Sequence, residues 1–146
     1  MALVNITING EKLQCQAGQT VLQAARAANI DIPTLCDHPA VTPWGGCRMC
    51  LVEIEKQRGL RPACTFPVSE GMVVSTHTER VTNARKFVLE LLFSERVHYC
   101  MYCAMSGNHE TTQCELQRLA YDHGLTHWRY EPNTAHPWPV DGSRKY

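Results

Sequence analysis

The sequence has no excess of charge of either sign, because its 14 lysine and arginine residues balance its 14 aspartate and glutamate residues. A neutral chain produces no long-range field that would attract nucleic acid or an anionic membrane surface, so neither is an expected partner. The chain also lacks a long hydrophobic run. Its most apolar stretch, residues 87–93, is far shorter than the roughly 20 residues of a transmembrane helix and contains Glu90. We therefore expect no insertion into a membrane.

Two further absences concern export and nucleotide binding. The first residues do not combine a basic region with a following apolar stretch, as a secretory signal does, so we expect a cytoplasmic protein. The sequence also contains no glycine-rich dinucleotide fingerprint, so it predicts no dinucleotide site of that type. At 146 residues and 44% apolar content, the chain can bury one modest core, which indicates one domain with an appendage.

Cysteine, by contrast, is abundant, with eight residues. Because the cytoplasm keeps thiols reduced, this abundance favours metal or redox sites, with structural disulfides as the alternative. Cys15 stands alone in a predicted strand and is expected to act as a small apolar side chain. The other seven form one group spaced C-x10-C-x2-C-x13-C and a second group spaced C-x2-C-x10-C. The two groups are Cys36, Cys47, Cys50 and Cys64, followed by Cys100, Cys103 and Cys114.

The spacing of both groups suits iron-sulfur clusters. Four thiolates are the ligand set of a [2Fe-2S] cluster, and Gly45 and Gly46 allow the backbone of the first group to approach an inorganic core closely. Tetrahedral zinc also accepts four thiolates, and three cysteines with one histidine are a common zinc set. Zinc, or thiols without a metal, therefore remains an alternative for the first group, and zinc a stronger one for the second.

Hydrophobic periodicity predicts a sheet with one helix in the first half of the chain. Residues 4–8 and 12–15 alternate around Asn9-Gly10, a strong hairpin signal, and Thr20 can cap a helix that runs to Asn29. Residues 51–55 and 72–75 are expected to form strands. A hairpin, a helix, a ligand loop and later strands in this order indicate a β-grasp sheet with a helix across one face.

The second half of the chain is expected to be helical. Residues 78–96 and 115–122 show helical spacing, and Gly124 is placed to end the second of these helices. The apolar stripe of the longer helix is expected to comprise Val81, Ala84, Phe87, Val88, Leu91 and Leu92. The sequence therefore predicts an α+β chain with a β-grasp domain at residues 1–77, a helical unit at 78–125 and an extended, proline-containing arm at 126–146.

Residues 36–39, 46–53 and 63–64 carry a family resemblance. They resemble the ferredoxin-like start of the large iron-sulfur subunit of bacterial complex I. The same module occurs in the diaphorase iron-sulfur subunit of NAD-reducing hydrogenases, in NAD-dependent formate dehydrogenases and in iron-only hydrogenases. The resemblance covers roughly residues 6–125. It implies a [2Fe-2S] β-grasp domain followed by a [4Fe-4S] cluster bound by one histidine and three cysteines.

The second cysteine group departs from the family pattern. Ten residues separate Cys103 from Cys114, where the family usually has five, so residues 108–112 resemble an insertion. The resemblance implies His98, two positions before Cys100, as the fourth ligand of the [4Fe-4S] cluster. His109, which lies within the insertion, is the alternative.

The function implied by the resemblance is electron transfer without catalysis by this chain itself. The chain would relay single electrons between a partner subunit with flavin and NAD(H) and a further redox subunit of an oxidoreductase of the hydrogenase, formate dehydrogenase or complex I type. A zinc-stabilised interaction module, a stand-alone ferredoxin and an iron-sulfur redox sensor are the alternatives. The aromatic residues of the arm could dock a partner subunit or fold back over the second cluster.

Overall fold

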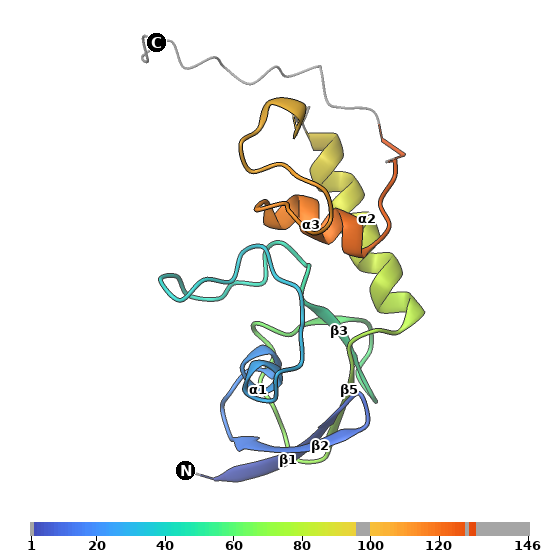
Figure 1. The fold of residues 1–146 in the computed structure, drawn as a ribbon. Helices are drawn as coiled ribbons and strands as arrows, with labels where there is room; N and C mark the ends of the chain where they lie inside the picture. Colours follow the sequence, from blue (N-terminus) through green and yellow to red (C-terminus); the bar gives the residue numbers. More distant parts are fainter. Residues whose placement is uncertain (1, 96–99, 128, 131–146) are drawn as a thin grey trace.

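The structure is a computed structural model of the chain, and it describes residues 2–95, 100–127, 129 and 130. A small sheet with one helix occupies one end of the molecule, and a helical unit occupies the other (Figure 1). The long loop that carries the first cysteine group lies between these two parts. This arrangement confirms the predicted α+β fold.

The predicted hairpin is present as strands β1 (Leu3–Ile8) and β2 (Glu11–Gln16), which pair antiparallel. The turn residues Asn9 and Gly10 have φ angles of 52° and 86°. Positive φ at both central positions is what a type I′ turn requires, and this turn matches the twist of the paired strands. The Asn-Gly signal in the sequence therefore set the register of the hairpin.

Helix α1 (Val21–Ala27) lies across one face of the sheet. Its start is fixed by a capping box, in which the Thr20 hydroxyl accepts the N–H of Gln23 and the Gln23 side chain accepts the N–H of Thr20. Its sheet-facing residues Val21, Leu22, Ala24 and Ala25 are buried. The predicted helix is thus confirmed, and it ends two residues earlier than expected.

Three further strands complete a five-stranded sheet in the order β2-β1-β5-β3-β4. They are β3 (Leu51–Ile54), β4 (Arg61–Pro62) and β5 (Met72–Ser75). Strands β1 and β5 run parallel, and the other pairs are antiparallel. The parallel central pair, with α1 packed on one face, is the β-grasp arrangement that the sequence predicts.

The helical unit contains α2 (Glu79–Glu95), a short 3-10 turn η1 (Cys100–Tyr102) and α3 (Glu115–Asp122). Both long helices were predicted, and Gly124, with a φ of 59°, follows the end of α3 as expected. In the described part of the chain, no helix is long and apolar enough to cross a bilayer.

The predicted apolar stripe of α2 is partly wrong. Phe87 and Leu91 are 42% and 44% exposed, whereas Arg85 and Leu89 are buried on the same face as Val81. The buried face follows a four-residue spacing that includes an arginine, because α2 packs on β3 and on the loop that precedes it. A search for regularly spaced apolar residues does not detect a buried helix face that includes a charged residue.

A second hydrophobic core joins the two ends of the molecule. Its fully buried members are Met49, Leu89 and Leu119, which come from the cysteine loop, α2 and α3. The partly buried side chains around them include Leu35 and Cys47, also from the loop. The loop therefore contributes to the core of the helical unit, and this fixes the loop against α2 and α3.

The start of the predicted arm lies against α2. The Arg129 Nε donates a 2.7 Å hydrogen bond to the carboxylate of Glu90, and the ring of Tyr130 meets that of Phe87 edge to face. The rest of the arm lies outside the described residues. The domain limits at residues 77 and 125 stay predictions.

Candidate metal centres

The first cysteine group lies in and beside the loop that leads from α1 to β3. An ion pair of 2.6 Å between Arg26 of α1 and Asp37 fixes the start of this loop next to Cys36. At its other end, Met49 is anchored in the second core. The loop is thus held by a surface ion pair near Cys36 and by packing of Met49 between Cys47 and Cys50.

The structure brings together the four thiols that the sequence predicts as ligands. The Cys47 N–H donates to the Cys36 sulfur at 3.4 Å, and the thiols of these two residues also contact each other. The thiols of Cys50 and Cys64, both buried, form a second contacting pair, and Cys64 lies within electrostatic range of Cys36. The four side chains therefore converge as two pairs, while no three of these described thiols are grouped closely enough to hold a single metal ion.

Backbone N–H groups point at these sulfur atoms. Those of Gly46 and Cys47 face Cys36, that of Gly45 faces Cys64, and those of Leu35, Cys36 and Met49 face Cys47. Arg48, with a φ of 61°, bends the backbone sharply between Cys47 and Met49. Hydrogen bonds to sulfur stabilise negative charge there, and they are one of the means by which proteins set the potential of an iron-sulfur cluster. The donor set fits such a cluster.

The protonation of the thiols follows from the same contacts. Burial raises the pKa of Cys64 to about 12, and the neighbouring Cys50 thiol acts in the same direction. Burial also acts to raise the pKa of Cys47, but the N–H donors and the Cys36 thiol outweigh it, so the pKa lies below its usual value. The thiolate is the form that binds metal, so Cys47 reaches this form more readily than an ordinary cysteine does and Cys64 less readily.

The loop contains two adjacent glycines, Gly45 and Gly46. Gly45 is buried and has a φ of 69°, a conformation that glycine adopts without strain. A Cβ on Gly46 would collide with the indole ring of Trp44. A Cβ on Gly45 would touch Pro62 and Thr65, so neither added carbon would have a cysteine sulfur as its nearest neighbour, and the close approach to a cluster stays a prediction.

The second cysteine group lies in the helical unit. Cys100 begins η1, the Cys103 N–H donates to the Cys100 carbonyl at 3.2 Å, and Cys114 precedes α3 as its N-cap residue. His98 lies outside the described residues. Within the described ranges, no three or more histidine, cysteine or acidic side chains are grouped closely enough to hold a single metal ion.

The apparent insertion at residues 108–112 folds back onto α3. The Asn108 side chain accepts the N–H groups of Glu110 and Thr111, which closes the turn, and the Tyr121 hydroxyl donates to the Gly107 carbonyl at 2.9 Å. Gln117 of α3 accepts the Gly107 N–H at 3.1 Å. The extra residues are thus accommodated along the helix.

His109 is engaged at the far end of α3 from Cys114. Its Nε2 lies 2.8 Å from the carboxylate of Asp122, and its ring meets that of Tyr121 edge to face. Asp122 lies eight positions after Cys114, which corresponds to about 12 Å along a helix. The structure therefore does not bring His109 to the three cysteines.

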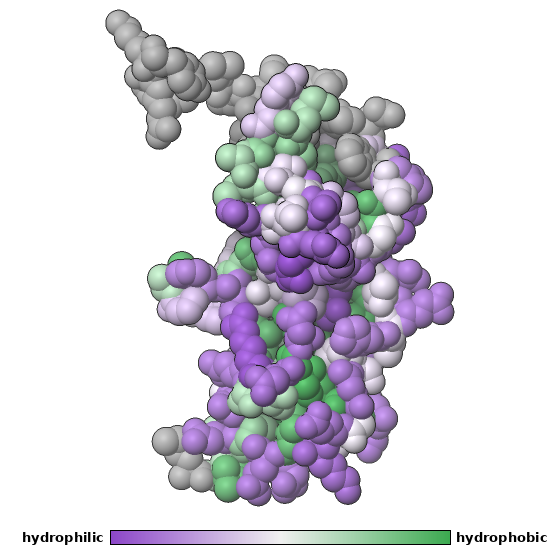
Figure 2. All heavy atoms as spheres, viewed as in Figure 1, coloured by the Kyte–Doolittle hydropathy of each residue, from purple (hydrophilic) through white to green (hydrophobic). Residues whose placement is uncertain are grey.

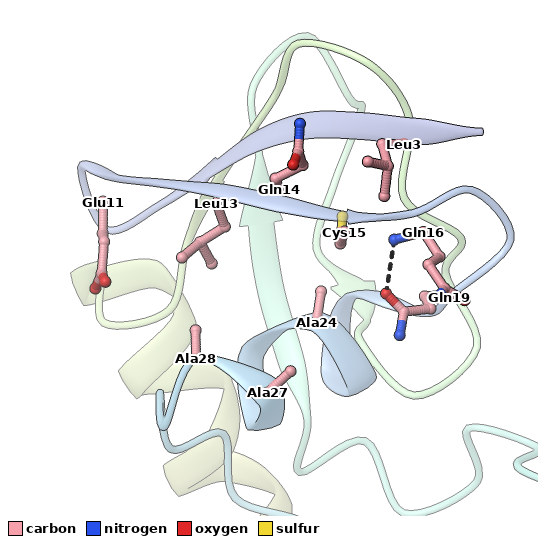
Figure 3. Close-up of a pocket in the computed structure, with 10 residues that line it drawn as sticks. All are labelled: Leu3, Glu11, Leu13, Gln14, Cys15, Gln16, Gln19, Ala24, Ala27 and Ala28. Carbon is pink, nitrogen blue, oxygen red and sulfur yellow. Dashed lines mark hydrogen bonds between the residues drawn. The ribbon is translucent and has the colours of Figure 1, made fainter. Parts of the chain in front are cut away.

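Cys15 is buried, as predicted, in the hydrophobic core between the sheet and α1, with its thiol 3.7 Å from the Val4 carbonyl. It lines a hollow between β2 and α1, where Ala24 and Ala28 lie across from Leu13 (Figure 3). None of the other seven cysteines lines this hollow. Cys15 therefore stands apart from the candidate metal centres.

Sequence reasoning did not identify Arg85, which approaches the first group from α2. Its Nη2 donates a 2.8 Å hydrogen bond to the carbonyl of Leu51, the residue after Cys50. The signal that could have found it is the four-residue spacing of Val81, Arg85 and Leu89, which places the arginine in line with two apolar residues.

Comparison with known proteins identifies two family matches. Residues 1–79 match the family described as "2Fe-2S iron-sulfur cluster binding domain". Residues 85–129 match the family described as "NADH-ubiquinone oxidoreductase-G iron-sulfur binding region", of the 4Fe-4S type. The predicted [2Fe-2S] and [4Fe-4S] cofactors are thereby confirmed, and nothing in these matches supports the zinc alternative.

Characterised proteins of two kinds are similar to the chain. The NADP-reducing hydrogenase subunit HndD of Solidesulfovibrio fructosivorans is 43% identical over 136 residues, which make up 90% of this chain and 22% of that protein. The mitochondrial NADH-ubiquinone oxidoreductase 78 kDa subunit of Candida albicans is 36% identical over 130 residues, 89% of this chain and 17% of the relative. The chain thus spans less than a quarter of the length of each of these two relatives.

A solved structure agrees with these relatives. The chain superimposes on a chain of the NAD+-reducing [NiFe]-hydrogenase in its H2-reduced state with a TM-score of 0.79 and 38% identity, covering 89% of this chain and 53% of that one. The match includes both the sheet and the helical unit, since it extends over most of the sequence. The chain therefore belongs to the family of 2Fe-2S iron-sulfur cluster binding domains, in the form that continues into the iron-sulfur binding region of the NADH-ubiquinone oxidoreductase-G family.

Proposed function

We propose that the chain is an electron-relay segment that passes single electrons between two iron-sulfur clusters and two partner subunits. The observation that carries the proposal is the convergence of four thiols under a set of backbone N–H donors. The iron supplies the electron chemistry, while the protein supplies position and electrostatics. The relatives, as subunits of hydrogenases and of NADH oxidoreductases, support the same function.

The proposed ligands follow the two cysteine groups. The [2Fe-2S] cluster would be held by two thiolates on each iron, with Cys36 and Cys47 as one pair and Cys50 and Cys64 as the other. The [4Fe-4S] cluster would be held by His98, Cys100, Cys103 and Cys114. The engagement of His109 with Asp122 supports His98 as the histidine ligand. A neutral imidazole in place of a thiolate removes one negative charge, which raises the potential of the second cluster.

The proposed partners are a subunit that carries flavin and NAD(H) and a further redox subunit of the same complex. The proposed location is the cytoplasm.

The proposal is tested on the whole chain, purified without oxygen. We expect a brown protein that contains two irons with two labile sulfides and a further four irons with four sulfides per chain. A colourless protein with bound zinc and no labile sulfide would contradict the proposal. Cys47→Ser is expected to remove the [2Fe-2S] electron paramagnetic resonance signal, whereas the matched control Cys15→Ser is expected to retain it.

The histidine assignment has its own matched pair of variants. His98→Ala is expected to perturb the [4Fe-4S] signal and to leave the [2Fe-2S] signal unchanged, because the first cluster has a complete ligand set. His109→Ala is expected to leave both signals unchanged. The opposite result, a [4Fe-4S] signal changed by His109→Ala alone, would identify His109 as the ligand. Reduction of the chain by a flavin-containing NADH dehydrogenase subunit, measured optically, tests the proposed electron donor.

A further inference from the structure

Arg85 is a buried cation beside the first cysteine group. It lies on α2, on the face that packs toward β3, and is only 2% exposed. Arginine is seldom buried this completely unless it is paired with an acidic group. In the described part of the chain, Arg85 forms no ion pair within 4 Å, so the usual partner of a buried guanidinium is missing.

The hydrogen bonds of Arg85 are also incomplete. The bond from Nη2 to the Leu51 carbonyl, at 2.8 Å, holds the guanidinium at the point where the cysteine loop enters β3. Its Nε is buried and has no hydrogen-bond partner among the described residues. A buried donor without a partner is costly, and its presence in a folded protein calls for an explanation.

The ionisable groups near Arg85 include one of the predicted cluster ligands, Cys50. Burial lowers the pKa of Arg85 to about 10, and the Cys50 thiol and Asp31 act in the opposite direction, so both lie within electrostatic range of the guanidinium. Asp31 is exposed to solvent. Arg85 therefore stays protonated at neutral pH, and the buried group that it faces is Cys50.

We propose that Arg85 is an electrostatic tuning residue for the [2Fe-2S] cluster: its fixed positive charge, held behind Cys50, stabilises the reduced cluster and raises the reduction potential. This inference rests on the ligand assignment proposed above. With four thiolates, the oxidised site carries two negative charges, and the entry of one electron adds a third without any bond or proton transfer. A nearby cation lowers the free energy of the more negative state more than that of the less negative one. Solvent screens it little, since the guanidinium is buried.

The position of Arg85 along α2 determines which of the two clusters its charge affects. Arg85 lies in the first half of α2, whereas the second cysteine group begins after the end of this helix. Ten residues of α2, about 15 Å of helix, separate Arg85 from the end that leads to Cys100 and Cys103. Cys114 is the N-cap residue of α3, and Arg85 lies within electrostatic range of His123 at the opposite end of that helix. The charge therefore acts mainly on the first cluster. Arg80, one turn earlier on the same helix, has a side chain that is 60% exposed and pairs with Glu53 on the surface. It provides a matched control.

The test is a redox titration of the [2Fe-2S] electron paramagnetic resonance signal in the whole chain. Arg85→Met and Arg85→Gln, which remove the charge, are expected to lower the equilibrium constant for reduction about tenfold, or about 59 mV for a one-electron couple. A unit charge on the order of 10 Å away in an effective dielectric near 20 has an effect of this size. Burial lowers the pKa of a lysine, so the titrations are run at about pH 6, where Arg85→Lys carries its charge and is expected to remain within about twofold of the wild type. Arg80→Met is expected to change nothing, and all four variants should leave the [4Fe-4S] potential unchanged.

Other outcomes are equally informative. An unchanged potential in a neutral variant that holds its full [2Fe-2S] content would overturn the proposal, as would an equal fall in Arg85→Lys. If the neutral variants fail to retain the cluster while Arg85→Lys retains it, the requirement for charge is supported. If all three lose it, the side chain acts through its shape and the proposal fails. A wild-type chain without a [2Fe-2S] signal would instead refute the ligand assignment itself.

Discussion

The four cysteines of the first group differ in how readily they lose a proton, although they share one site. Cys47 accepts N–H groups from three residues and has a lowered pKa, whereas burial raises the pKa of Cys64. Cys47 therefore loses its proton to an arriving iron more readily than an ordinary thiol does, and Cys64 less readily. Because metal binding releases these protons, loading of the site is expected to become easier as the pH rises.

The difference predicts an order of chemical modification in the metal-free chain. The thiolate is the nucleophile, so iodoacetamide near neutral pH is expected to modify Cys47 several-fold faster than Cys64. As the pH rises toward the Cys64 pKa of about 12, Cys64 is expected to become reactive too. Mass spectrometry of peptides from timed samples measures both rates. The urea-unfolded chain is the control, and equal rates in the folded chain would contradict the prediction.

At the scale of single elements, α2 shows that a helix can be predicted while its buried face is not. Its position followed from periodicity, but Leu89 is fully buried and Leu91, which was assigned to the apolar stripe, is 44% exposed. Both are leucines of one helix, so composition cannot separate them. Their burial depends on where Met49 and Leu119 meet the helix, and those residues are far away in the sequence.

The two leucines make a matched pair for a stability measurement. Leu89→Ala is expected to lower the free energy of unfolding by about 2–5 kcal/mol, because it leaves a cavity in the second core. Leu91→Ala is expected to change it by less than about 1 kcal/mol, since its side chain is already half in water. Urea denaturation of the reduced, metal-free chain measures both. Similar losses in the two variants would contradict the assignment of the buried face.

The start of α1 offers a second prediction for an element. Thr20→Ala removes the side-chain half of the capping box and is expected to lower the free energy of unfolding by about 1 kcal/mol. Thr82→Ala, at an exposed position inside α2, removes no cap and is expected to be neutral or slightly stabilising, because Ala is the better helix former. Thermal unfolding followed by circular dichroism distinguishes the two. A Thr20→Ala variant as stable as the wild type would show that the cap contributes nothing.

At the scale of the whole molecule, the sequence predicted individual turns, helices and strands better than the packing contacts between elements that are distant in the sequence. The Asn9-Gly10 turn and the Thr20 cap depend on neighbours close in the chain, and these predictions were confirmed. The four cysteines of the first group stay predicted ligands. The burial of Met49 against Leu119, by contrast, joins residues that are distant in the sequence. No local pattern marks such a contact. For the same reason, the engagement of His109 by Asp122 became visible only in the folded chain.

Met49 provides a test of that connection. Met49→Ala is expected to lower the free energy of unfolding by about 2–5 kcal/mol and to increase hydrogen exchange in both the loop at residues 36–50 and α3. Met105→Ala, whose side chain is 45% exposed, is the control and is expected to alter neither. Mass spectrometry of exchanged peptides measures the two regions separately. Faster exchange in α3 alone would mean that the loop is held without Met49.

The surface of the molecule carries exposed apolar side chains near the second cysteine group. Apolar side chains are exposed at and after η1, where Met101 and Tyr102 are each 84% exposed, and Figure 2 shows a pale green area at that end of the molecule. The surface lies next to Cys100 and Cys103. An electron that enters or leaves the second cluster through this end would cross only a short stretch of protein.

The burial of Met49 in the second core has a consequence for how the holoprotein is built. Met49 lies between Cys47 and Cys50 in the sequence, and its side chain has no core in which to pack until α2 and α3 have come together. A chain shortened after β5 would keep every thiol of the first group, yet it would leave this methionine in water and its two flanking residues free to move. Insertion of the smaller cofactor is thus expected to follow the docking of α2 and α3 on the loop.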